Sequence, residues 1–188
     1  MKSSIGIFYQ LTVRDKSGKV VRKTRLRRSR SFCLAFLQMI QVQSMLVTGT
    51  IKDVDGSNES APKYESMFAV NAGAGQDIYG TQLGTGTTPV ENDDFVMETK
   101  IMNGGGATQL NYGLQADIPA IEVGANVDYQ LLRSFTNNSG GTIQVTEAGI
   151  YAFIKAATFA MTVHDVFTAV PVADGETITA TYTFRTTV

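Results

Sequence analysis

Apolar and polar residues alternate along several stretches of the chain, which is the period of half-buried β-strands. The clearest runs lie at residues 5–13, 95–101, 127–135, 159–163 and 178–184. Segments rich in Gly, Asn, Asp and Pro separate these runs and favour turns. Seven or more short strands with turns between them predict a mainly β protein, an antiparallel β-sandwich of jelly-roll-like type.

The N-terminal part of the chain predicts a β-hairpin. Residues 5–13 alternate, Asp15–Lys19 favours a short turn around Gly18, and residues 20–28 return as a second strand. Lys23, Arg25 and Arg27 follow one another on one side of that second strand. The hairpin is therefore expected to carry one strongly basic face.

A helix is predicted directly after this hairpin. Apolar residues recur there at helical spacing, and Leu34 and Leu37 widen the apolar face. The residues that set the spacing are Phe32, Phe36, Met39 and Ile40. Because apolar residues lie on so much of its circumference, we expect this helix to be well buried.

Residues 49–66 form a polar stretch with Gly, Pro, Asp and Ser, which favours a linker loop. This stretch predicts a division into a basic hairpin and helix at 1–48, a linker at 49–66 and a sandwich body at 67–188. Within the body, the Gly/Thr-rich segment 71–89 is expected to be a long loop. The segment Asn137–Gly141 is expected to be a hairpin turn, and the phase change at Glu147–Gly149 predicts a β-bulge.

Charge is distributed unevenly along the chain. The first 30 residues carry ten Lys and Arg against one acid, whereas the other 158 carry six against sixteen. Such a separation favours docking of the basic segment on an acidic surface. Seven residues form the predicted partner-binding set: Lys19, Arg22, Lys23, Arg25, Arg27, Arg28 and Arg30. Binding of nucleic acid by the same residues is a weaker alternative, because no aromatic side chains are interleaved with them for stacking, and a plain solvated face is the other alternative.

Residues that could support catalysis or metal binding are sparse. His164 is the only histidine, and its neighbour Asp165 would point to the opposite face of a strand. Cys33 is the only cysteine and lies in the apolar helix, where a core position is expected. Asp53–Glu59 resembles a calcium loop, but its glycine comes two positions too early. We therefore expect neither an enzyme nor a bound cofactor or metal. No apolar run is long enough for a membrane span, so no membrane partner is expected.

Three segments carry a resemblance to a known class of proteins. They are "GTGTTPVENDDFVMETKI" (Gly84–Ile101), "LLRSFTNNSGGTIQVTEAGIY" (Leu131–Tyr151) and "VPVADGETITATYTF" (Val170–Phe184). In this order they resemble virion structural proteins of tailed bacteriophages over residues 80–188. Ala148 departs from the pattern, since the related proteins more often have Ile or Val at that position.

This resemblance implies a non-enzymatic virion component, assembled in the host cytoplasm and present in many copies. The expected function is that of a capsid-associated decoration or cement protein that binds neighbouring capsid or tail subunits, as a homo-oligomer. Two alternatives stay open: a tail or fibre accessory protein, and a glycan- or receptor-binding sandwich that uses the Gly-rich loops 73–86 and 103–106.

Overall fold

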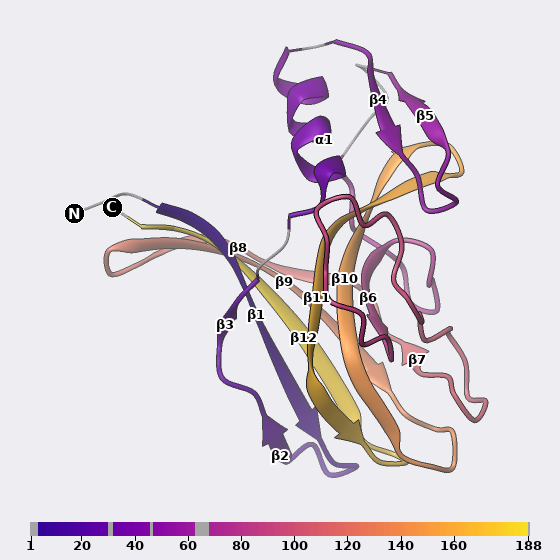
Figure 1. The fold of residues 1–188 in the computed structure, drawn as a ribbon. Coiled ribbons are helices and arrows are strands. Elements are labelled where there is room, and N and C mark those ends of the chain that lie inside the picture. Colours follow the sequence, from indigo (N-terminus) through magenta and orange to yellow (C-terminus); the bar gives the residue numbers. More distant parts are fainter. Residues whose placement is uncertain (1–3, 30–31, 46, 63–67, 188) are drawn as a thin grey trace.

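The computed structural model describes residues 4–29, 32–45, 47–62 and 68–187, and consists mainly of two antiparallel β-sheets (Figure 1). The larger sheet has the order β2-β1-β12-β9-β7, formed by Val20–Lys23, Ser4–Arg14, Thr177–Thr187, Asn126–Thr136 and Asn111–Tyr112. Two further strands join this sheet: β3 (Arg27–Arg28) pairs with β1, and β8 (Ala116–Val123) pairs with β9.

The smaller sheet has the order β11-β10-β6. Its strands are Thr158–Val172, Ile143–Lys155 and Gly80–Gly84. Apolar residues from both sheets, among them Leu11, Phe135, Ile150 and Val163, belong to one buried core. The predicted mainly β, antiparallel sandwich is thus confirmed, whereas its jelly-roll type stays a prediction.

The first strand is part of the larger sheet and not of a separate arm. β1 pairs with β12 over its whole length, from Ser4 opposite Thr187 to Arg14 opposite Thr177. Its inward side chains, such as Ile7 and Leu11, lie in the common core. The predicted boundary at residue 48 therefore does not separate two units of the sandwich. The pairing of β1 with β12 joins the basic N-terminal segment to the same sheet as the rest of the chain, so the contrast in charge does not mark a boundary.

The predicted linker also contains regular structure. β4 (Gly49–Lys52) and β5 (Asn58–Ala61) form a two-stranded sheet of their own. Ile51 is fully buried, and the Gly49 backbone lies so close to helix α1 that an added Cβ would be 2.6 Å from Cγ2 of Val42. Residues 63–66 of the predicted linker lie outside the described residues. Within the described residues, no helix is long and apolar enough to cross a membrane.

The predicted helix is α1, Leu34–Met45, but only one side of it is buried. Ala35, Met39 and Val42 face the core, whereas Leu34 and Leu37 are more than half exposed. The expectation of a well-buried helix was therefore wrong. α1 lies at one end of the sandwich beside β4 and β5, so the sheets cover only its inner side (Figure 1).

Two connections differ from the sequence-based expectation. Asn137–Gly141 joins β9 in the larger sheet to β10 in the smaller sheet, so it is an arch between sheets and not a hairpin turn. The fully buried Asn137 side chain holds this arch, because its Nδ2 donates to the carbonyl oxygens of Gly141 and Val172, both at 2.7 Å. The Gly/Thr-rich stretch expected to be a loop contains β6, every residue of which is buried.

Candidate functional site

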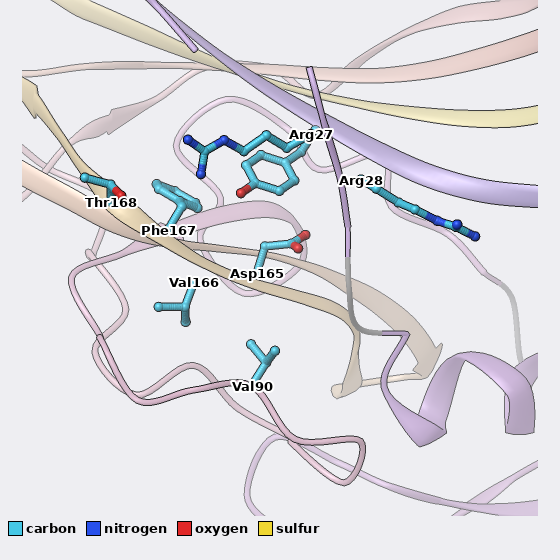
Figure 2. A pocket seen from close by; sticks show the side chains of 8 residues that line it. Arg27, Arg28, Val90, Asp165, Val166, Phe167 and Thr168 are labelled. Carbon is cyan, nitrogen blue, oxygen red and sulfur yellow. The ribbon is translucent and has the colours of Figure 1, made fainter. Parts of the chain in front are cut away.

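A groove of about 680 Å³ opens on one side of the sandwich, between strand β11 of the smaller sheet and strands β1 and β3 of the larger one (Figure 2). Eight residues line it: Tyr9, Arg27, Arg28, Val90, Asp165, Val166, Phe167 and Thr168. A second hollow of about 220 Å³ shares four of these and adds Thr24, Arg25, Ala169 and Val170. Because of the shared lining, the two hollows form one elongated depression, called the basic groove below.

The floor of the basic groove is aromatic. The rings of Tyr9 and Phe167 are 5.6 Å apart, and Tyr9 also lies 6.3 Å from the buried ring of Tyr182. Asp165 is almost fully buried beside them. Burial, followed by the charge of Asp165, raises the pKa of Tyr182 well above its usual value. Burial of this ring thus favours the neutral phenol of Tyr182.

One wall of the groove is an irregular part of β11. Val166 lies opposite Glu147 and Val170 opposite Val145, so residues 167–169 face the single residue Thr146 on β10. This register shift is a β-bulge, and it interrupts the ladder between the two strands. Glu147–Gly149, where a bulge was predicted, pairs in regular register with β11, so that prediction was wrong in position. β11 is also the outer strand of its sheet, covered at Thr162 by a hydrogen bond of 3.1 Å from the Cys33 amide.

The opposite wall carries part of the predicted partner-binding set. Arg27 pairs through its backbone with Tyr9, and its side chain extends above Phe167 (Figure 2). Arg28 points the other way along the strand, close to Gly6, where an added Cβ would lie 3.5 Å from its Nε atom. Arg25 lines the second hollow. The basic groove thus combines aromatic carbon with guanidinium groups, which suits an extended, acidic and partly apolar ligand.

The other predicted residues have different environments. Lys19 and Lys23 are exposed, whereas Arg22 forms an ion pair with Glu176. Arg30 lies outside the described residues. Within the described part of the chain, no ion pair joins Lys19, Lys23, Arg25, Arg27 or Arg28 to an acidic residue. One predicted residue is therefore used internally, and five are available to a partner.

A second polar cluster lies on the other face of β11 and was missed by sequence reasoning. The ring of His164 places Nε2 at 2.8 Å from Oε1 of Glu147 and Nδ1 at 2.6 Å from Oδ2 of Asp94. Glu147 is fully buried and also accepts backbone hydrogen bonds from Gly86 and Glu98, at 3.1 and 2.8 Å. The cluster therefore fastens the segment 86–98 to the smaller sheet.

The electrostatics of this cluster favour an ionised set. Burial lowers the pKa of His164, but its hydrogen bonds to Glu147 and Asp94 outweigh this and raise it. Burial raises the pKa of Glu147, and its hydrogen bonds with His164 and the Glu98 amide more than compensate and lower it. Burial raises the pKa of the nearby Cys33 thiol to about 12, with Asp94 and Asp165 adding to the effect. These shifts favour the charged forms of His164 and Glu147 and disfavour the thiolate of Cys33.

Comparison with protein-family models, with curated proteins and with solved structures gave no match. The resemblance to phage virion proteins therefore stays a prediction. The functional argument below rests on the geometry of the chain itself, above all on the basic groove.

Proposed function

We propose that this protein is a structural component of a bacteriophage virion, in particular a capsid-associated decoration or cement protein. It binds an acidic surface of a neighbouring capsid or tail subunit and stabilises the particle. The observation that carries this proposal is the basic groove, in which Arg25 and Arg27 stand unpaired by acids of the described chain over an aromatic floor.

Charge and shape support a protein partner. Guanidinium groups at the edge of an apolar surface form directed, charge-assisted hydrogen bonds with carboxylates. Aromatic residues and arginines are also the residue types that most often dominate binding energy in interfaces. A phosphate chain would use the guanidinium groups alone, whereas a protein segment can also cover the apolar rim of the groove.

A second exposed surface supports multivalent contacts. Leu34, Leu37, Ile40 and Met45 lie on the outer side of α1 and are each at least 45% exposed. Exposed apolar side chains that cluster on one element commonly mark an interaction surface. The basic groove and this helix face belong to different parts of the molecule, which suits a protein that joins more than one neighbour (Figure 1).

Particle assembly with a charge-reversed groove tests the proposal. Arg25→Glu combined with Arg27→Glu should leave the sandwich folded, because both side chains are exposed, but reduce incorporation into particles at least tenfold. Lys16→Glu combined with Lys52→Glu is the matched control, since it changes the net charge equally at positions outside the groove. Electron microscopy of the particles then places the protein on the head or on the tail.

Two results would redirect the proposal. Normal incorporation of the groove variant would remove the docking role of the basic groove. Tight binding of duplex DNA by the wild-type protein, steeply weakened by salt and abolished by the same substitutions, would favour a nucleic-acid partner instead.

A further inference from the structure

The larger sheet extends beyond the sandwich as a projecting arm. The β8–β9 hairpin reaches away from the smaller sheet, beside the start of β1 and the end of β12 (Figure 1). The pairing of Asn126 with Thr187, and of Thr187 with Ser4, places the hairpin end and both chain ends together. We call residues 114–128, which include β8 and the hairpin end, the β8 arm.

β8 is an exposed strand with apolar side chains. Every one of its eight residues is exposed, including Ile118, Ile121 and Val123, the second of them to 52%. Among the described residues β8 pairs only with β9, so its other edge is unpaired, but Pro119 has no amide N–H and the register with β9 shifts between Ile118 and Ile121. Proline and a shifted register disfavour a continuous strand ladder at this edge, so a partner would contact β8 mainly through its exposed side chains.

The charges of the β8 arm complement those of the basic groove. The arm contains Asp117, Glu122 and Asp128 but no Lys or Arg. Asp128 is already held by Arg185, with contacts of 2.5 and 2.6 Å. Asp117 and Glu122 lie on the exposed strand and have no ion pair with any described residue. By the register with β9, Asp117 and Glu122 lie on the same face of β8, opposite to Ile118 and Ile121, so the two acids can face the two arginines together.

We propose that the β8 arm of one copy docks in the basic groove of the next copy. β8 lies along the groove with the face that carries Asp117 and Glu122 turned toward Arg25 and Arg27. Asp117 and Glu122 then bind Arg25 and Arg27.

This contact is heterologous, because a different surface of each copy takes part. Repetition of such a contact closes into a ring or continues as a linear array. Pairing of two β8 strands about their midpoint is disfavoured, because it would set Asp117 opposite the partner's Glu122, and like charges across a strand pair repel. The inference rests on the proposed function, since copies must lie side by side in a particle for the contact to form there.

Charge exchange between groove and arm tests this contact in the purified full-length protein. Sedimentation velocity over a concentration series measures self-association of the wild type. We expect Arg25→Glu with Arg27→Glu, and separately Asp117→Lys with Glu122→Lys, each to weaken it at least tenfold. An equimolar mixture of the two variants should associate as tightly as the wild type, because every arm then finds a groove of opposite charge.

Three outcomes would overturn the contact. The first is a wild-type protein that stays monomeric up to about 1 mM. The second is loss of association in the arm variant alone, with the groove variant unaffected, which would indicate pairing between arms. The third is a mixture that associates no better than its components. Lys16→Glu with Lys52→Glu should associate like the wild type, and circular dichroism should show all variants folded.

The same variants separate this inference from the proposed function. An arm variant that fails to self-associate but enters particles at the wild-type level leaves the virion role intact and removes only the contact between copies. A groove variant that self-associates normally but is absent from particles also removes the contact between copies and supports the docking role of the groove. A groove variant that fails to self-associate but enters particles normally keeps the contact and removes the docking role.

Discussion

His164 and Glu147 form a buried ion pair across β10 and β11, with Nε2 of the ring 2.8 Å from Oε1 of the carboxylate. The other ring nitrogen contacts Asp94, so both nitrogens face carboxylates. Each of these contacts is a hydrogen bond to an ionised acceptor only if the ring carries both protons. The histidine is therefore a positively charged link between the smaller sheet and the segment that contains Asp94.

Replacing Glu147 by glutamine should destabilise the protein by about 3–5 kcal/mol, because it leaves the buried imidazolium with one acid instead of two. Glu147→Gln keeps the size of the side chain, so the loss reports charge and hydrogen bonding. Urea unfolding followed by circular dichroism measures the change. Glu122→Gln, on the exposed strand β8, is the matched control and should change the free energy of unfolding by less than about 0.5 kcal/mol.

The contribution of His164 to stability should depend on pH. Because folding raises the pKa of His164 above its usual 6.5, its contribution is complete below 6.5 and is lost as the pH rises through the folded-state pKa. Folding lowers the pKa of Glu147 from 4.5, so the contribution of that carboxylate is complete above 4.5 and is lost as the pH falls through its folded-state pKa.

The difference in the free energy of unfolding between the wild type and His164→Gln isolates this effect, since the other titrating groups largely cancel. We expect a larger difference at about pH 5.5 than at about pH 9. A difference that is constant over this range would mean that folding does not change the pKa of His164, and a smaller difference at pH 5.5 would mean that folding lowers it.

Arg133 organises the segment before β6 from inside the core. Although only 1% exposed, its guanidinium donates hydrogen bonds of 2.6–3.2 Å to five backbone carbonyl oxygens. These belong to Gly73, Gln76, Tyr79, Thr81 and Gly113. The irregular Gly-rich backbone is thus satisfied by one side chain, which has no acid as partner among these contacts.

Arg133→Lys should therefore destabilise the protein by about 2–3 kcal/mol, because an ammonium group has three donors and leaves buried carbonyl groups without a partner. Hydrogen exchange should increase first at residues 73–81. Arg185→Lys is the control, since this arginine is partly exposed and a lysine there should cost no more than about 1 kcal/mol. Equal effects of the two substitutions would contradict the structural role of Arg133.

The strands could be predicted because their signal is local. Alternation at 127–135 and 178–184 corresponds to β9 and β12, which pair with each other along their whole length. The connection Asn137–Gly141 could not be assigned correctly from its neighbours alone. Whether it closes a hairpin or joins two sheets depends on β9 pairing with β12, a strand about 40 residues further on.

The candidate sites show the same limit. The basic residues were visible in sequence because they follow one another, and Arg25 and Arg27 do reach the groove. The groove itself needs Tyr9 and Phe167, which are far apart in the chain. His164 was set aside because Asp165 points to the opposite face, but its partners Asp94 and Glu147 lie 70 and 17 residues away. A single histidine gives no signal for contacts at that separation.

The final prediction compares Arg22, which forms an ion pair within the chain, with Arg25, which forms none with a described residue. Arg22 pairs with Glu176, whose side chain is only 14% exposed and also accepts a hydrogen bond of 2.8 Å from the Ala173 amide. Arg22→Gln should therefore cost about 1 kcal/mol, since it removes the cation beside a largely buried carboxylate. Arg25→Gln, with no such acid, should change the free energy of unfolding by less than about 0.5 kcal/mol. Urea unfolding measures both changes in the free energy of unfolding. Self-association of the folded variants should follow the reverse order, so that Arg25→Gln associates more weakly than Arg22→Gln. If Arg25→Gln proved the more destabilising of the two, Arg25 would have a role within the fold and would not be free for a partner.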